Sequence, residues 1–399
     1  MWSRYNPGNV FRQSASGYFM FIENTFLNQN SPLRLILIKG KKMKKILISM
    51  LAVIAFNPAW AAPPITGSPT IITPKELLDW PQDTPQSNPY LTEPTSNRLN
   101  DLHGQIEDCD IVLSTGGNYH MALKDLWRDY YLPTYAKKLG LKNWFYTTSP
   151  PVTPAQFKTH SVQFGNFDAN CAPQVAVGPQ GIMKQLIAEG ATDGEPLPIL
   201  KNYGNVILIK KGNPKNIHSI WDLGRPDVSV VTPNPGLEKG AFGNFSGSIY
   251  DIAAKDPHPP AGMTADKLFN SIFNNPDAQH GTSENKRPKW VAGKRIMHRE
   301  QPFMVDNGYA DAGVIFYHLA RYMTETFPDK FDWVPLGGTK EAPKPVAGNK
   351  VGVFKIVRLK PPAGQHWSKK QKAATDALIE SYKTDEFTKI LEKHGLRRP

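Results

Sequence analysis

The stretch that decides the fold is NVILIKKGNPKNIHSIWDL, residues Asn205–Leu223. Its apolar β-formers at Val206–Ile209 predict a buried strand. Lys210–Pro214 (KKGNP) predicts a turn, because glycine and proline interrupt regular structure. Ile217–Leu223 then predicts a short helix, and Val228–Thr232 predicts the next strand. A strand, a helix and a second strand in this order are typical of an α/β fold.

The same alternation continues on both sides of this stretch. Further strands are predicted at Ile111–Leu113, Trp144–Tyr146, Val175–Val177, Ala310–Phe316 and Val351–Val357. Helices are predicted at Met121–Tyr131, Ile182–Glu189, Ala373–Tyr382 and Glu386–His394. Strands that alternate with helices predict mostly parallel sheets covered on both faces. At roughly 100–200 residues per domain, a chain of 399 residues predicts two core-forming units.

The amino-terminal part of the chain predicts a secretory signal peptide at residues 43–61. Lys41–Lys45 (KKMKK) precedes the apolar stretch Ile46–Phe56, and Ala59 and Ala61 form an A-x-A cleavage site. That apolar stretch is too short to cross a hydrocarbon core of roughly 30 Å as a helix. We therefore expect cleavage near Ala61 and a periplasmic protein. Residues 1–42 are expected to lie upstream of the true start.

The net charge of +12 is concentrated in this leader. Residues 1–61 contain eight of the 47 basic residues and one of the 35 acidic residues, so the rest of the chain carries about +5. This balance argues against nucleic-acid binding, which needs a strongly basic surface. We expect a monomer without a nucleic-acid partner.

Residues 62–107 are predicted to form an extended arm, because eight prolines fall within residues 62–100. Cys109 and Cys171 are the two cysteines of the chain, and an exported protein is expected to pair them in a disulfide. Two buried thiols are the alternative. The histidines have no metal-ligand spacing, so neither a metal nor a cofactor is expected.

Three polar loops directly follow predicted strands, at Ser114–Asn118, Thr147–Ser149 and Thr232–Gly236. In open α/β sheets, ligands bind beyond the carboxyl ends of the strands, where helix N-termini present free N–H groups. These loops predict an anion-binding site, although ordinary turns use the same residue types. Ser114 lacks the G-x-S-x-G motif of a nucleophile, which disfavours catalysis.

Three segments resemble periplasmic solute-binding proteins of ABC importers, and the molybdate-binding group is the nearest. Asn205–Leu223 has the apolar strand, the Lys-x-Asn-Pro turn and the Ser-x-x-Asp-Leu helix of that family. Arg299–Phe316 (REQPFMVDNGYADAGVIF) resembles its return helix and strand, and Thr384–Leu396 resembles its last helix. The resemblance covers about residues 108–399.

The resemblance implies two doubly wound α/β lobes joined by a hinge, the type II periplasmic-binding-protein fold, which closes on its ligand. Lobe 1 would comprise residues 108–200 and 335–399, and lobe 2 residues 201–334. The ligand contacts that it implies are Ser114, Thr115, Gly117, Asn118, Thr148, Ser149, Gly240, His298, Arg299 and Phe316. Phe316 stands where the molybdate group commonly has tyrosine, so another oxyanion or a small polar solute fits as well.

The resulting hypothesis is a binding protein without catalytic activity. It would capture a molybdate-like oxyanion or a polar solute and deliver it to an ABC permease in the inner membrane. Two alternatives remain open at this stage. One is a secreted hydrolase that uses Ser114 or His298, and the other is a sensor or adhesion module whose proline-rich arm contacts a partner.

Overall fold

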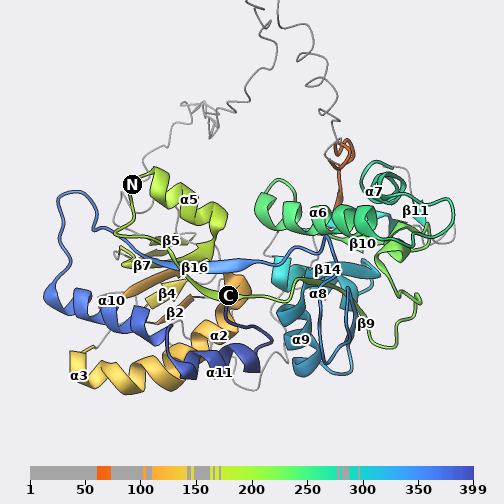
Figure 1. Cartoon of the computed structure of the whole chain (residues 1–399). Helices are drawn as coiled ribbons and strands as arrows, with labels where there is room; N and C mark the ends of the chain where they lie inside the picture. Colours follow the sequence, from red (N-terminus) through yellow and green to blue (C-terminus); the bar gives the residue numbers. More distant parts are fainter. Residues whose placement is uncertain are drawn as a thin grey trace, which may run out of the picture. The chain divides into compact units, whose positions relative to one another are not determined.

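The computed structural model describes residues 61–72, 102–104, 110–141, 145–147, 162–164, 167–169, 172–275, 279–280, 287–294 and 297–399. They belong to one compact unit, Trp60–Pro399, which contains two six-stranded sheets (Figure 1). Residues 1–60, which hold the upstream segment and all of the predicted signal peptide except Ala61, lie outside the described residues, as do both cysteines. None of the helices in the described ranges has the length and apolar character needed to cross a membrane.

The first sheet has the strand order β2-β4-β3-β7-β16-β8. Its strands are β2 (Leu102–Gly104), β3 (Val112–Thr115), β4 (Phe145–Thr147), β7 (Val175–Pro179), β8 (Leu197–Lys201) and β16 (Val353–Arg358). Its helices are η1 (Gly117–Tyr119), α2 (His120–Asp125), η2 (Leu126–Ala136), α3 (Lys137–Leu139), α5 (Gln180–Ala188), α10 (Lys369–Ser381) and α11 (Asp385–Lys393). The strands β5 (Val162–Phe164) and β6 (Phe167–Ala169) pair with each other in a separate two-stranded sheet.

The second sheet has the strand order β1-β13-β10-β14-β9-β15. Its strands are β1 (Thr70–Ile71), β9 (Asn205–Lys210), β10 (Val230–Val231), β13 (Trp290–Ala292), β14 (Ala312–Phe316) and β15 (Phe331–Pro335). Its helices are η3 (Ile220–Gly224), α6 (Lys239–Lys255), α7 (Ala265–Phe273), α8 (Met297–Asp306) and α9 (Tyr317–Thr326). A short hairpin pairs β11 (Gln279–His280) with β12 (Arg287–Pro288).

The α/β fold class is confirmed, but the prediction of mostly parallel sheets is wrong. β9 runs antiparallel to β14 and β15, and β16 runs antiparallel to β7 and β8. β9 follows β8, and β16 follows β15, so each arrives from the other sheet (Figure 1). Neither strand is reached through the helical crossover that joins parallel neighbours within one sheet. Their direction is therefore set by the passage between the sheets.

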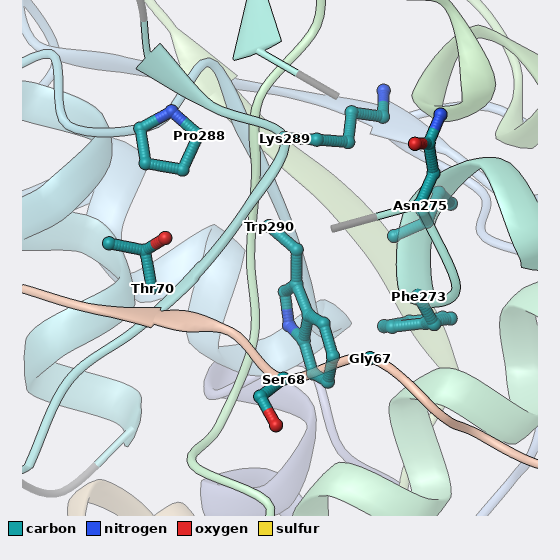
Figure 2. Close-up of a pocket in the computed structure, with 9 residues that line it drawn as sticks. Gly67, Ser68, Thr70, Phe273, Asn275, Pro288, Lys289 and Trp290 are labelled. Atoms are coloured by element: carbon teal, nitrogen blue, oxygen red, sulfur yellow. The ribbon is translucent and has the colours of Figure 1, made fainter. Parts of the chain in front are cut away.

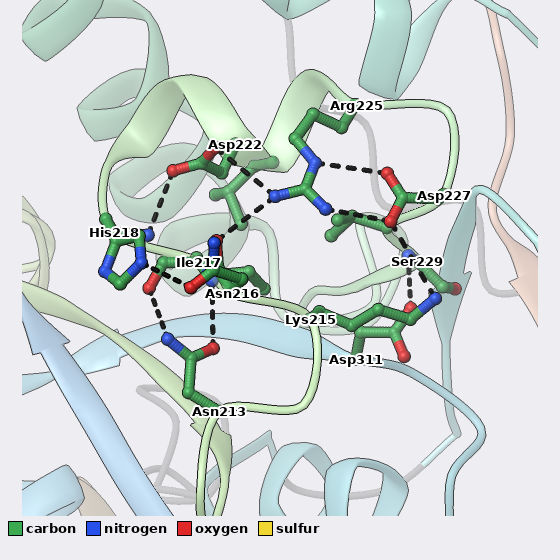
Figure 3. Close-up of polar contacts among 12 residues, drawn as sticks. Asn213, Lys215, Asn216, Ile217, His218, Asp222, Arg225, Asp227, Ser229 and Asp311 are labelled. Carbon is green, nitrogen blue, oxygen red and sulfur yellow. Dashed lines mark hydrogen bonds and ion pairs between the residues drawn. The ribbon is translucent and has the colours of Figure 1, made fainter.

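The quoted stretch folds locally as its residues predict (Figure 3). Asn213 has a left-handed backbone with φ of 49°, and its side-chain oxygen accepts the N–H of Ile217 at 2.9 Å. The Asp222 carboxylate accepts the N–H of Ser219 at 2.9 Å and completes a capping box. The predicted helix is a 3-10 helix, η3, which begins three residues later than expected because these turn contacts extend to Ser219.

Two of the passages between the sheets, from β8 to β9 and from β15 to β16, are tied to each other by two buried asparagines. The side-chain oxygen of Asn202, after β8, accepts the N–H of Gly352 at 2.8 Å, while its amide donates to the Tyr119 hydroxyl at 3.2 Å. The side chain of Asn349 makes two bonds with the backbone of Asn205, at 2.8 and 2.9 Å. Both crossings therefore form one hydrogen-bonded connection.

Residues 61–72 of the predicted arm lie along the edge of the second sheet. β1 pairs in parallel with β13, and the N–H of Ile72 donates to the carbonyl of Ala292 at 2.9 Å. The side chain of Asn274 accepts the N–H of Thr66 at 2.7 Å and donates to the carbonyl of Pro64 at 2.9 Å. Figure 2 shows the small cavity left between this segment and the sheet, which has a volume of about 20 Å³ and could hold one water.

Replacing Gly67 with alanine is expected to lower the free energy of unfolding by about 1–3 kcal/mol, as overpacking does. A Cβ on Gly67 would lie 2.1 Å from the carbonyl oxygen of Phe273, so the arm would have to move away from α7. Denaturant titration measures the loss, and limited proteolysis reports the release of residues 61–72. Gly181→Ala in α5 is the matched control, because a Cβ there meets nothing within 4 Å. Equal stability of the two variants would contradict the prediction.

Candidate functional site

The first group of predicted site residues lies at the carboxyl end of β3. Ser114 and Thr115 end this strand and are buried, and the 3-10 turn Gly117–Tyr119 follows directly. The hydroxyl oxygen of Thr115 is buried and has no hydrogen-bond partner within the described part of the chain. Buried polar atoms are rarely left without a partner, so this hydroxyl marks a candidate contact.

The neighbouring strand β4 ends at the same edge, because Ser114 is the register partner of Thr147. The predicted contacts Thr148 and Ser149 directly follow β4 in sequence and lie outside the described residues.

The second group lies at the start of α8, at the carboxyl edge of the second sheet. His298, Arg299, Glu300 and Gln301 are consecutive, and each is 4% exposed or less. Successive helical residues point about 100° apart, so the burial of four in a row means that this helix end is enclosed on all sides. Such burial of a charged run is uncommon for surface helices, which bury one face only.

The Glu300 carboxylate is held by the loop that precedes α8, whereas the side-chain oxygen of Gln301 is not. The Glu300 carboxylate accepts the N–H of Lys294 at 3.2 Å and rests against Gly293. A Cβ at Gly293 would lie 1.7 Å from the carboxyl carbon, so a larger residue there would displace the Glu300 carboxylate. The side-chain oxygen of Gln301 is buried and makes no hydrogen bond with any described residue.

Glu238 and the predicted contact Gly240 lie at the start of α6. The Glu238 side chain does not cap its own helix but accepts the backbone N–H of Met297 at the start of α8. Burial, with a contribution from the negative charge of Glu300, raises the pKa of Glu238 to about 7. Gly240 is exposed, and a Cβ there would meet nothing within 4 Å.

An aromatic stack connects the turn after β3 with the end of β14. The ring of His318, at the start of α9, stacks on Tyr119 at 4.7 Å and on Phe316 at 5.6 Å. Its Nε2 lies 2.5 Å from the carbonyl oxygen of Asn118. Burial lowers the pKa of His318 to about 3, so the ring is neutral and Nε2–H donates to that carbonyl. The predicted contacts Asn118 and Phe316 are thus brought together through His318.

Sequence reasoning did not place Tyr119, His318 or Gln301 in the site. His318 follows β14 as directly as Asn118 follows the end of β3, so the strand-end rule applied to β14 would have found it. No sequence pattern identifies Gln301, because a polar residue near the start of a helix is ordinarily exposed.

Comparisons with known proteins find similar sequences and structures. A 40-residue stretch is 55% identical to the sulfate-binding proteins of Salmonella typhimurium (strain LT2) and Escherichia coli (strain K12). This match spans 10% of the chain and 12% of the length of those relatives.

Among solved structures, Peb3 of Campylobacter jejuni is 18% identical with a TM-score of 0.44, and the match covers 72% of this chain and all of Peb3. The sulfate-binding protein SubI of Mycobacterium tuberculosis H37Rv is 16% identical with a TM-score of 0.45, and the match covers 72% of this chain and 86% of SubI.

The model of the bacterial extracellular solute-binding proteins matches residues 172–397, which is more than half of the chain. This range contains α6, α8, β14 and the passages from β8 to β9 and from β15 to β16. The chain therefore belongs to the bacterial extracellular solute-binding protein family.

Proposed function

We propose that this protein captures a small oxyanion or anionic polar solute in the periplasm and delivers it to an ABC permease. The enclosed start of α8 is the observation that carries the proposal. Arg299 and the first N–H groups of this helix lie at the carboxyl edge of the second sheet. A helix N-terminus and a guanidinium both favour negative charge, and the guanidinium can bind two oxygens at once.

The first sheet supplies complementary donors in this proposal. The Thr115 hydroxyl and the N–H groups of the turn Gly117–Tyr119 follow β3, and the contact between Asn118 and His318 links this edge to α9. Neutral donors of this kind bind an oxyanion well once water is excluded. Exclusion of water would come from a hinge motion about the two crossings at Asn202 and Asn349.

The proposal predicts stabilisation and compaction by ligand. The full mature chain can be screened by thermal shift against sulfate, phosphate, molybdate and small organic acids. At least one of these compounds is expected to raise the melting temperature of the protein, because a ligand that binds the native state stabilises it. Small-angle scattering with that ligand is expected to show a smaller radius of gyration. A binding ligand that leaves the radius unchanged would contradict hinge closure, and turnover of the ligand would favour a hydrolase.

A further inference from the structure

A second cavity lies at the C-terminal end of α6, the helix whose other end belongs to the candidate site. Its volume is about 340 Å³, within the range of small-molecule pockets, roughly 300–1,000 Å³. Since α6 has 17 residues and a helix rises about 1.5 Å per residue, its two ends are far apart. The cavity is lined by the end of α6 and by the passage from β15 to β16, through Ile252, Lys255, Asp256, Pro257, Val346 and Ala347.

The wall that the passage contributes is anchored on both sides of the cavity. The N–H of Val346 donates to the carbonyl of Leu336 at 3.1 Å, and the N–H of Asn349 donates to the carbonyl of Val346 at 3.0 Å. A Cβ on Gly348 would lie 2.2 Å from the carbonyl oxygen of Asp251, so the passage rests directly on α6. The cavity therefore lies between two elements that are packed against each other.

Two opposite charges line this cavity without neutralising each other. The ammonium of Lys255 has neither a hydrogen-bond nor an ion-pair partner among the residues that the structure describes. The carboxylate of Asp256 accepts the indole N–H of Trp221 at 2.7 Å and the backbone N–H of His258 at 2.9 Å. These bonds lower the pKa of Asp256, and its oxygens can each accept a further donor.

The rest of the lining is apolar. Ile252, Pro257, Val346 and Ala347 supply it, and the Val346 side chain is 42% exposed. An apolar group seated here would remove this surface from water, which is favourable. A wholly apolar ligand would leave both charges unpaired as it covered them, and a simple carboxylate would face Asp256 without a donor. The end of α6 favours a cation as well, because the C-terminus of a helix carries partial negative charge.

We propose that this cavity is a second binding site, which takes a small zwitterion with an apolar side chain, the chemistry of a free apolar amino acid. The ligand carboxylate pairs with Lys255, its ammonium group donates to Asp256, and its side chain packs on Val346 and Ala347. The inference does not depend on the proposed function, because none of these residues belongs to the candidate site.

Isothermal titration of the mature chain with three related probes tests the site. L-leucine carries both charges, 4-methylpentanoate lacks the ammonium group and 3-methylbutylamine lacks the carboxylate. L-leucine is expected to bind at one site, and each truncated probe about fivefold more weakly, because an exposed ion pair contributes up to about that factor.

Variants of the cavity then locate the bound probe. Lys255→Gln is expected to weaken L-leucine about fivefold and to leave 3-methylbutylamine unchanged, because only the former has a carboxylate to lose. Lys389→Gln, which removes an exposed lysine on α11, is the matched control and is expected to change neither affinity. Ala347→Trp fills the cavity and is expected to abolish binding of both probes.

Absence of L-leucine binding would overturn the inference, as would binding that persists in a folded Ala347→Trp protein or an equal loss of both probes in Lys255→Gln. Circular dichroism verifies folding. Lys255→Glu, at the same exposed position, is the second variant and is expected to weaken L-leucine more than the glutamine variant does. Titration with phosphate and sulfate tests oxyanion capture separately, so failure of either proposal is distinguishable from failure of the other.

Discussion

Replacing Arg299 with methionine is expected to weaken oxyanion binding about 100-fold or more. A buried, charged group that contacts its partner through hydrogen bonds costs about 2–5 kcal/mol on truncation. Arg299 is enclosed at the start of α8, where the N–H groups of the helix already favour negative charge. Isothermal titration with phosphate and sulfate measures the loss.

Two further variants make the Arg299 result interpretable. Arg299→Lys keeps the charge but loses the planar fork, so its affinity is expected to lie between those of the methionine variant and the unaltered protein. Arg225→Met removes an equal charge from a guanidinium that bonds Asp227 at 2.8 Å, and is expected to leave affinity within about a factor of two. Circular dichroism verifies folding. Unchanged affinity in a folded Arg299→Met protein would remove this residue from the site.

Reduction of a Cys109–Cys171 disulfide is expected to lower the free energy of unfolding by about 4 kcal/mol, the chain-entropy value for a loop of this length. Neither cysteine is among the described residues, and the prediction is motivated by the register of the strands that follow them. β3 and β7 are parallel neighbours in which Leu113 pairs with Val175, a separation of 62 residues. Cys109 and Cys171 are also 62 residues apart.

The same pairing extends toward the cysteines. The N–H of Gln174 donates to the carbonyl of Val112 at 3.1 Å, and the side-chain oxygen of Gln174 accepts the N–H of Val112 at 2.6 Å. If the register continues, the two cysteines lie opposite each other at about the 4.8 Å spacing of adjacent strands. That spacing falls within the Cα separation of a disulfide, roughly 4.4–6.8 Å.

Mass spectrometry of the exported protein, with and without alkylation, decides whether the bond exists. Denaturant titrations with and without reductant then measure its contribution, and the Cys109→Ala, Cys171→Ala double variant is expected to match the reduced protein. Ligand affinity is expected to persist after reduction, because β3 and β7 meet the proposed site at their other ends. Two free thiols in the exported protein would contradict the prediction.

Local sequence patterns determined the identity of most elements. The apolar segment Val206–Ile209 lies within β9, and Ile111–Leu113 overlaps β3, because short runs of apolar, mostly β-branched residues favour strands that are buried on both faces. The turn that begins at Asn213 was equally readable, since its bonds involve residues four apart. By contrast, β8, β13, β15, α6, α7 and α9 were not predicted.

Only the tertiary structure decided the direction of β9 and β16, the attachment of β1 to β13 and the contacts within the proposed site. The polar start of α8 looks like an ordinary exposed turn in the sequence, and nothing local indicates that Glu238 turns toward Met297 or that His318 reaches Asn118, 200 residues away. The periodicity of a segment records which of its own faces is buried. Which segment covers that face depends on pairings between residues far apart in the chain, and these carry no local signature.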